Sequence, residues 1–262
     1  VPDDELPNVD KKIAKVAEDV KAHVNLQKLL SLATSVSEKV VDPFNIPKTR
    51  LRLGIAKDEA FNFYYADNIH LLEKTGIELI PFSPISDNYL PDVDALYFGG
   101  GYPEEFASQL AANKSLKKEV YEFSQASKPI YAECGGLMYL GKALKQGENE
   151  FSMVGIFDGI SEMTPRLKKF GYCEAYPQVD CLLGNKGQKI VGHEFHHSTF
   201  KNLDQQLKPA LLMKKVRDNQ IVDTWPGGYQ IRKTFASYLH VHFYQDPKLF
   251  MQFLNNLGAD MQ

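Results

Sequence analysis

The stretch that decides the fold of this chain is Pro129-Ile130-Tyr131-Ala132-Glu133-Cys134-Gly135-Gly136. Its apolar beginning, residues 129–132, predicts a buried strand, and residues 135–144 predict a helix that follows almost at once. Between them, the two glycines allow the backbone to turn tightly. A strand that runs directly into a helix is the repeating unit of a parallel sheet covered by helices.

The same alternation continues on both sides of this stretch. Before it, we expect strands at residues 51–56, 77–82 and 95–98, and helices at residues 66–75, 105–112 and 116–126. After Gly147 the sequence becomes rich in predicted strands, at residues 172–179, 188–194, 211–216 and 235–239, before a last helix at residues 247–257. The pattern predicts an α/β fold with a mainly parallel sheet flanked by helices.

The first 48 residues have a different character. Residues 10–41 are mostly helix-forming, with apolar side chains at helical spacing among Lys and Glu, which predicts one or two amphipathic helices. Residues 42–50 contain two prolines and predict a linker. Because the chain begins at Val1 without a Met or a leader pattern, we expect it to be a fragment of a longer protein.

Composition and charge exclude several classes of protein. Of the 262 residues, 44% are hydrophobic and 24% are charged, which is ordinary for a globular domain. The 30 basic and 33 acidic residues give a net charge of -3, so the charge balance offers no reason to expect nucleic acid or an anionic membrane as a partner. No apolar run approaches the roughly 18 residues of a membrane span. Three cysteines are too few for a disulfide framework and favour a cytoplasmic location.

Cys134 is the sharpest candidate for chemistry. At a strand-to-helix turn its thiol would be presented at the carboxyl edge of the sheet, where the helix N-terminus favours a thiolate. The backbone N–H of Gly135 would be placed to face a developing oxyanion. The alternative is a structural cysteine beside a glycine-rich turn, because free cysteines are among the most buried residues.

A second glycine-rich segment, Gly99 to Glu104, follows the predicted strand at residues 95–98. It matches neither a dinucleotide fingerprint nor a phosphate loop, so it predicts a cradle for an oxyanion or a substrate carboxylate, with an ordinary turn as the alternative. The histidines at 193 and 196 lack the spacing that would place both on one face of a zinc-binding helix. We therefore expect no metal site.

A thiol nucleophile needs a base, and histidines gather in two places. One group lies at residues 193–197; the other is His240 and His242, which alternate along a predicted strand and so share one face. Either of this second pair is a plausible base, with the other as its neighbour. For each histidine the alternative is an ordinary core or surface residue.

Six motifs occur in order along the chain, at residues 58–65, 82–84, 99–104, 132–140, 192–196 and 236–240. Together they resemble the glutamine amidotransferase domain of cobyrinic acid a,c-diamide synthases, over about residues 51–250. The resemblance implies the flavodoxin-like architecture of class I glutamine amidotransferases. It also implies that residues 1–48 are the last helices of an ATPase domain plus a linker, and that residues 251–262 are the end of the C-terminal helix.

The resemblance implies a mechanism as well. Cys134 would attack the side-chain amide of glutamine and form a thioester, with Gly100 or Gly101 and Gly135 holding the oxyanion and His240 acting as the base. The position of the usual third member, a Glu, is occupied here by His242. The third member is then absent, or it is a carboxylate from elsewhere; Glu194 is our candidate, with His242 in a supporting role.

The full enzyme implied is an ATP-dependent ligase that amidates cobyrinic acid. ATP and Mg²⁺ would be bound by a separate domain, since this chain has no phosphate loop and is expected to bind no cofactor itself. The tetrapyrrole would be bound through that domain, in a full-length enzyme that could form a homodimer. The alternatives are an amidotransferase for another tetrapyrrole of the nickel-sirohydrochlorin type, a stand-alone thiol hydrolase or isomerase, and a binding module in which Cys134 is structural.

Overall fold

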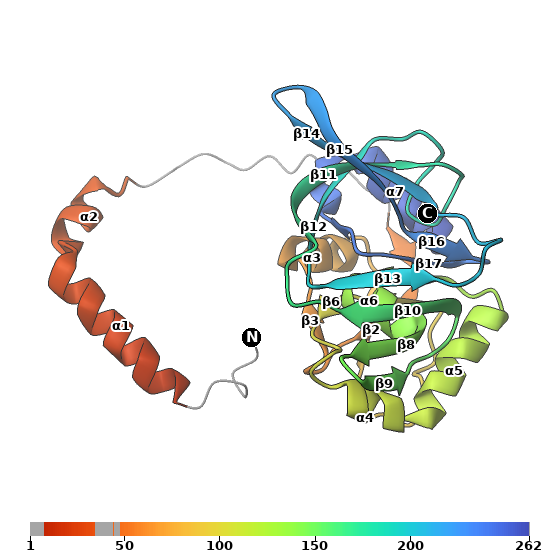
Figure 1. Cartoon of the computed structure of the whole chain (residues 1–262). Coiled ribbons are helices and arrows are strands. Elements are labelled where there is room, and N and C mark those ends of the chain that lie inside the picture. The colour runs from red at the N-terminus through yellow and green to blue at the C-terminus, as the bar shows by residue number, and fades with distance from the viewer. Residues whose placement is uncertain (1–7, 35–43, 45–47, 262) are drawn as a thin grey trace. The chain divides into compact units, whose positions relative to one another are not determined.

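The computed structural model describes residues 8–34, 44 and 48–261 of the chain (Figure 1). Contacts divide the chain into two compact units, Val1–Pro43 and Phe44–Gln262. In the described residues, no helix combines the length and the apolar character that crossing a membrane requires.

The first unit contains two helices, α1 (Val9–His23) and α2 (Leu26–Leu32). Asn25 caps α2 by accepting a hydrogen bond from the backbone N–H of Lys28 at 2.9 Å. Neither helix buries a residue, and apolar side chains such as Ile13 and Leu30 lie exposed. The predicted amphipathic helices are present over this range, and the remainder of the prediction, residues 35–41, falls outside the described residues.

The second unit is built on a six-stranded sheet with the order β16-β17-β7-β5-β2-β4. Its strands are β2 (Arg52–Ala56), β4 (Glu78–Phe82), β5 (Ala95–Phe98), β7 (Ile130–Glu133), β16 (Tyr229–Ile231) and β17 (Thr234–Ser237). All neighbours from β17 to β4 run parallel, and only β16 at the edge is antiparallel. The predicted α/β fold with a mainly parallel sheet is therefore confirmed.

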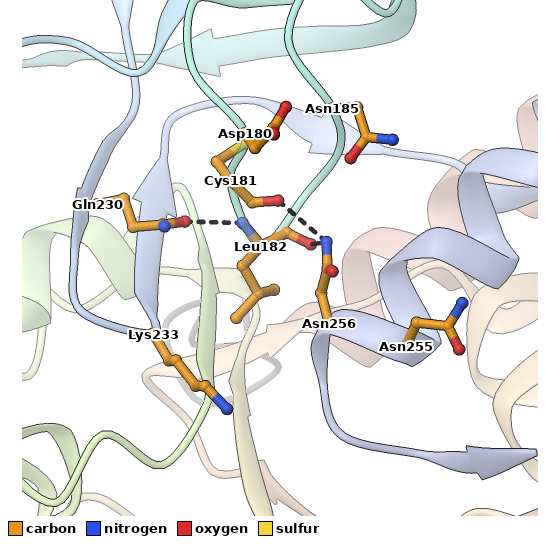
Figure 2. A pocket seen from close by; sticks show the side chains of 8 residues that line it. All are labelled: Asp180, Cys181, Leu182, Asn185, Gln230, Lys233, Asn255 and Asn256. Atoms are coloured by element: carbon orange, nitrogen blue, oxygen red, sulfur yellow. Dashed lines mark hydrogen bonds between the residues drawn. The ribbon is translucent and has the colours of Figure 1, made fainter.

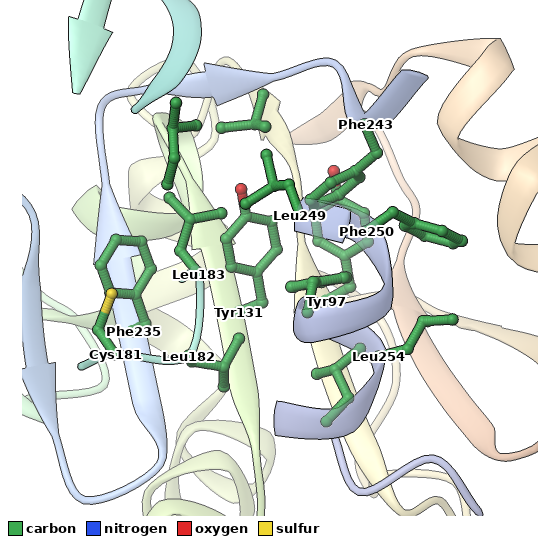
Figure 3. Close-up of a cluster of buried hydrophobic side chains, with 14 of the residues drawn as sticks. Tyr97, Tyr131, Cys181, Leu182, Leu183, Phe235, Phe243, Leu249, Phe250 and Leu254 are labelled. Carbon is green, nitrogen blue, oxygen red and sulfur yellow. The ribbon is translucent and has the colours of Figure 1, made fainter. Parts of the chain in front are cut away.

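Helices cover both faces of this sheet. They are α3 (Ala66–Lys74), α4 (Ala107–Ala112), α5 (Lys114–Gln125), α6 (Gly135–Leu140), the 3-10 turn η2 (Phe243–Gln245) and α7 (Pro247–Asn256). One core lies between the sheet, α3 and α7; Figure 3 shows Leu249, Phe250 and Leu254 of α7 close to the buried rings of Tyr97 and Tyr131. The other core lies under α4, α5 and α6.

Two further sheets extend the unit. A four-stranded sheet contains β8 (Gly141–Gln146), β9 (Asn149–Ser152), β10 (Phe157–Met163) and β13 (Ser198–Asn202). A five-stranded sheet contains β11 (Lys169–Pro177), β12 (Ile190–His196), β14 (Leu211–Arg217), β15 (Gln220–Gly227) and β18 (His240–Val241). Short pairs join β3 (Phe61–Phe63) to β6 (Gly100–Gly101), and β1 (Thr49–Arg50) to β19 (Asp260–Met261).

The helix predicted at residues 135–144 is only partly correct. It ends at Leu140, and from Gly141 the chain becomes strand β8, which pairs with β10 and β9. A Cβ at position 141 would lie 3.0 Å from the ring of Phe200, so the glycine leaves room for that ring, which reaches across β10 from β13. Short apolar runs fit a helix or a strand equally well, and here the long-range pairing decides.

Candidate active site

Cys134 occupies the sharp turn between β7 and α6. Its backbone has φ 47° and ψ -100°, a combination that residues other than glycine rarely adopt. Two hydrogen bonds hold it there: its N–H donates to the carbonyl of Ser237 at 2.7 Å, and its carbonyl accepts from the N–H of Met138 at 3.3 Å. A strained cysteine between a parallel strand and a helix has the geometry of a nucleophile elbow, which presents the side chain beyond the sheet edge.

The predicted glycine cradle lies beside this turn. Gly101 has φ 152°, and a Cβ there would lie 2.1 Å from the carbonyl oxygen of Ala60, so only glycine fits. A Cβ on Gly100 would lie 2.6 Å from Cε1 of His240. The backbone nitrogen of Gly101 is 3.3 Å from the position a Cβ of Gly135 would take. The structure thus brings all three predicted glycines to the surroundings of Cys134.

Asp58 stabilises the backbone next to this cradle. Its carboxylate accepts hydrogen bonds from the N–H of Ala60, the hydroxyl of Ser83 and the N–H of Ile85, each at 2.9 Å. Burial raises the pKa of Asp58 although these hydrogen bonds oppose the shift. They fix the start of β3, which pairs with the glycines of β6. The motifs at residues 58–65 and 82–84 therefore hold the cradle.

His240 lies next to Cys134, on the short strand β18. Its side chain is 5% exposed, and its Nδ1 donates a hydrogen bond to Oε2 of Glu133 at 3.4 Å. Burial by itself lowers the pKa of His240, but the hydrogen bonds with Cys134 and Glu133 outweigh burial and raise it to about 10. An imidazolium held against a thiol is the setting in which a cysteine becomes a reactive thiolate.

Glu133 makes the contact that we expected of Glu194. Its Oε1 accepts hydrogen bonds from the hydroxyl of Tyr131 at 2.7 Å and from the N–H of Val241 at 3.2 Å, while Oε2 accepts from His240. The sequence carried one signal for this role, because Glu133 directly follows an apolar run that predicts a buried strand. In the structure its side chain is only 1% exposed, and a buried carboxylate needs partners to offset its burial.

Glu194 lies elsewhere, and that expectation is corrected. In the pairing of β12 with β18, His193 stands opposite His240, so the next side chain, Glu194, points to the other face of the sheet. There its Oε2 accepts a hydrogen bond from Nε1 of Trp225 at 3.1 Å and lies 3.6 Å from Nε2 of His196.

His242 and His240 have separate surroundings. The strand ends at Val241, and Nε2 of His242 donates to Asp67 at 3.2 Å in a half-exposed position, with the ring of Tyr65 5.0 Å away. The shared face that strand alternation predicted for the two histidines therefore does not produce a common site.

The other two cysteines are core residues. Burial raises the pKa of the Cys173 thiol to about 12, and burial also raises that of Cys181. Cys181 and its neighbours line a cavity of about 330 Å³, which Lys233, the residue before β17, also lines (Figure 2). The side-chain amide of Asn256 donates hydrogen bonds to the carbonyls of Cys181 and Leu182, and the side-chain oxygen of Gln230 accepts one from the N–H of Leu182. These contacts assign the loop a structural role.

Over residues 8–34, 44 and 48–261, no group of three His, Cys, Asp or Glu is placed to hold a metal ion.

Comparison with known proteins gives a consistent family. The family of CobB/CobQ-like glutamine amidotransferase domains matches residues 52–248. A cobyrinate a,c-diamide synthase from Limosilactobacillus reuteri (strain DSM 20016) is 92% identical over all 262 residues, which are 58% of its length. One from Streptococcus sanguinis is 47% identical over 97% of the chain and 56% of its own length. The chain thus spans less than two thirds of these curated relatives.

Solved structures support the fold. The PurLQS structure from Thermotoga maritima superposes with a TM-score of 0.56 at 18% identity, over 81% of this chain and 100% of that one. A solved glutamine amidotransferase superposes with a TM-score of 0.55 at 20% identity, over 79% of this chain and 98% of that one. The similarity of architecture extends well beyond the similarity of sequence.

Proposed function

Since the chain belongs to the family of CobB/CobQ-like glutamine amidotransferase domains, we propose that it hydrolyses the side-chain amide of glutamine and releases ammonia. The observation that carries the proposal is a chain of hydrogen bonds that joins the thiol of Cys134 to the imidazole of His240 and this imidazole to the carboxylate of Glu133. This order of groups activates a nucleophile and returns its proton to a leaving group.

The reaction follows from this arrangement in two halves. The thiolate of Cys134 attacks the amide carbon, and backbone N–H groups of the cradle formed by Gly100, Gly101 and Gly135 receive the oxyanion. When the C–N bond breaks, His240 gives its proton to the departing nitrogen, and ammonia leaves a thioester on Cys134. Water then loses a proton to His240 and attacks the thioester carbon, and the carbon–sulfur bond breaks. This frees glutamate and restores the thiolate of Cys134 beside the protonated His240.

We propose that Glu133 is the third member of this catalytic set. Its carboxylate holds the Nδ1–H of His240, so that Nε2 faces the thiol, and it stabilises the imidazolium that forms. The hydroxyl of Tyr131 and the N–H of Val241 fix the carboxylate in turn. His242 pairs with Asp67 and would act on the site only from a distance.

The whole enzyme is a second part of the proposal. We propose that the chain is the ammonia-supplying part of an ATP-dependent ligase that amidates the a and c carboxylates of cobyrinic acid in the cytoplasm. The names and the greater length of the relatives support this, with ATP and Mg²⁺ bound in the additional part. The exposed apolar side chains of α1 and α2 support assigning residues 1–48 to the end of that part, because such helices need a partner to cover them.

The test uses the 262-residue chain with glutamine as substrate. Wild type should release ammonia and glutamate in equal amounts, and Cys134→Ser should release neither, because an alcohol at the elbow is a far poorer nucleophile at neutral pH. A diazo or chloroketone analogue of glutamine should modify Cys134 in the wild type. Cys173→Ser is the matched control and should keep full activity. Glutamine hydrolysis by Cys134→Ser would disprove the proposal.

A further inference from the structure

The ring of His193 lies flat against the ring of His240. Their centroids are 5.0 Å apart and their planes differ by 23°, an arrangement that follows from the pairing of residue 193 on β12 with residue 240 on β18. Phe63 of β3 packs edge-on against both rings, at 4.8 Å from His240 and 6.3 Å from His193. Two flat side chains from other strands, His193 of β12 and Phe63 of β3, thus pack against the ring of His240.

His193 is itself fixed by a separate element. Its Nδ1 shares a hydrogen bond of 2.7 Å with the hydroxyl of Tyr65, the residue that precedes α3. The ring of Tyr65 also packs edge-on against Phe63 at 5.8 Å. The position of the His193 ring is therefore set by α3 and β3 as well as by its own strand.

This stack matters because the reacting ring must be held precisely. A hydrogen bond of 3.4 Å to Glu133 and one to Cys134 hold the His240 ring by its nitrogens, and a displacement of about 1 Å in a reacting group can cost roughly a hundredfold in rate. The flat ring of His193 and the edge of Phe63 oppose a tilt of the His240 ring about these hydrogen bonds.

The charge of His193 is part of the same argument. Burial lowers the pKa of His193, and so does the neighbouring His240, while Glu133 and Glu194 oppose the shift. Tyr65 from the start of α3 and Tyr172 from β11 complete the polar groups that face it. Protonation of His193 would place two positive rings face to face, which would push His240 away from Cys134.

We propose that His193, fixed by Tyr65, is a positioning residue that orients His240 for glutamine hydrolysis and that it does so only as the uncharged imidazole. The inference rests on the proposed function. It predicts that protonation of His193 lowers the activity on the acid side of the pH profile.

Three variants test this with glutamine as substrate, each checked by circular dichroism. His193→Ala should lower kcat about tenfold to a hundredfold at pH 8 with little change in KM, since orientation is lost and binding is not. His193→Phe keeps a flat ring that cannot be protonated, so it should retain most of kcat and stay active to lower pH than the wild type. Tyr65→Phe should lower kcat by a smaller factor, and it covers the case in which His193→Ala does not fold.

Val191→Ala is the matched control, because Val191 lies two residues earlier on the same exposed face of β12. It should leave kcat and the pH profile unchanged. Wild-type kcat in His193→Ala would overturn the proposal, and an unchanged acid limb in His193→Phe would overturn the requirement for an uncharged ring. If the proposed function itself fails, wild type and control will be inactive too, which distinguishes the two failures.

Discussion

Two pairs of glutamate and histidine are buried in the part of the chain that the structure describes, and in only one of them does the histidine form a hydrogen bond with a thiol. In the first, Glu133 and His240 are 3.4 Å apart at the elbow. In the second, Glu194 and His196 are 3.6 Å apart on the core face of β12. Each of these four side chains is nearly or completely buried. From the sequence alone the second pair is easier to recognise as a possible contact, because its members are two residues apart.

The two pairs differ in the partner of the ring nitrogen that does not face the glutamate. In His240, Nδ1 donates to the carboxylate of Glu133, and the other side of the ring forms a hydrogen bond with Cys134. For His196, Nδ1 donates to the backbone carbonyl of Ser198 at 2.8 Å, and the ring stacks on Tyr238 with centroids 3.8 Å apart. A carboxylate–imidazole pair therefore becomes a candidate for proton transfer only where its free edge meets a nucleophile.

Removal of each imidazole gives the largest expected difference. His240→Ala should lower kcat for glutamine hydrolysis by about two to four orders of magnitude, the usual cost of losing a general acid and base. His196→Ala should instead lower the melting temperature, because a buried ring stacked on Tyr238 is lost, and keep kcat within about tenfold of wild type. Steady-state kinetics and thermal unfolding by circular dichroism measure both. Equal losses of kcat would remove the distinction between the pairs.

Removal of each carboxylate charge should give a smaller difference in the same direction. Glu133→Gln should lower kcat by about two orders of magnitude, since an amide holds the Nδ1–H but does not stabilise the imidazolium. Glu194→Gln should change kcat only a few fold, because an amide oxygen can still accept from Trp225. The reverse order in glutaminase kinetics would return the third position to Glu194.

The reactivity of the three thiols compares the elbow with the core of the wild-type chain. Iodoacetamide at pH 7.5 should modify Cys134 well before Cys173 and Cys181, and peptide mass spectrometry measures the modification of each. Alkylation needs the thiolate, and burial raises the pKa of Cys173 to about 12, so its thiol stays protonated and its reaction should accelerate only as the pH rises. In denaturant the three thiols should react alike. Equal reactivity in the native chain would mean that Cys134 is not activated.

The smallest effect is expected at the neighbouring histidine. His242→Ala should change kcat no more than a few fold, since the half-exposed side chain pairs with Asp67 outside the elbow. The measurement is the same kinetics as for His240→Ala, on the same day and batch of substrate. If His242→Ala proved the more damaging of the two, the base would be His242, and His240 would become the supporting residue.

The sequence was sufficient for the elements whose signal is local. Apolar runs at residues 95–98 and 129–132 predicted the central strands β5 and β7, and the Cys-Gly-Gly turn forms the elbow. Residues 141–144 were wrongly predicted to continue the helix, because their strand is defined by its pairing with β10 and β9. The strands β3 and β6 were missed for the same reason, since each is two or three residues long and is defined by the other.

The sequence by itself determined the parallel α/β fold, the family, Cys134 at its turn, and the glycines that allow close approach to it. The fold and the turn follow from periodicity and backbone freedom, which are properties of neighbouring residues, and the family follows from the resemblance that the six ordered motifs carry. Only the tertiary structure decided that Glu133 and not Glu194 meets His240, and that His193 covers it. Strand register and the face on which a side chain emerges are set by contacts between segments far apart in the chain, and a shift of one residue reverses that face.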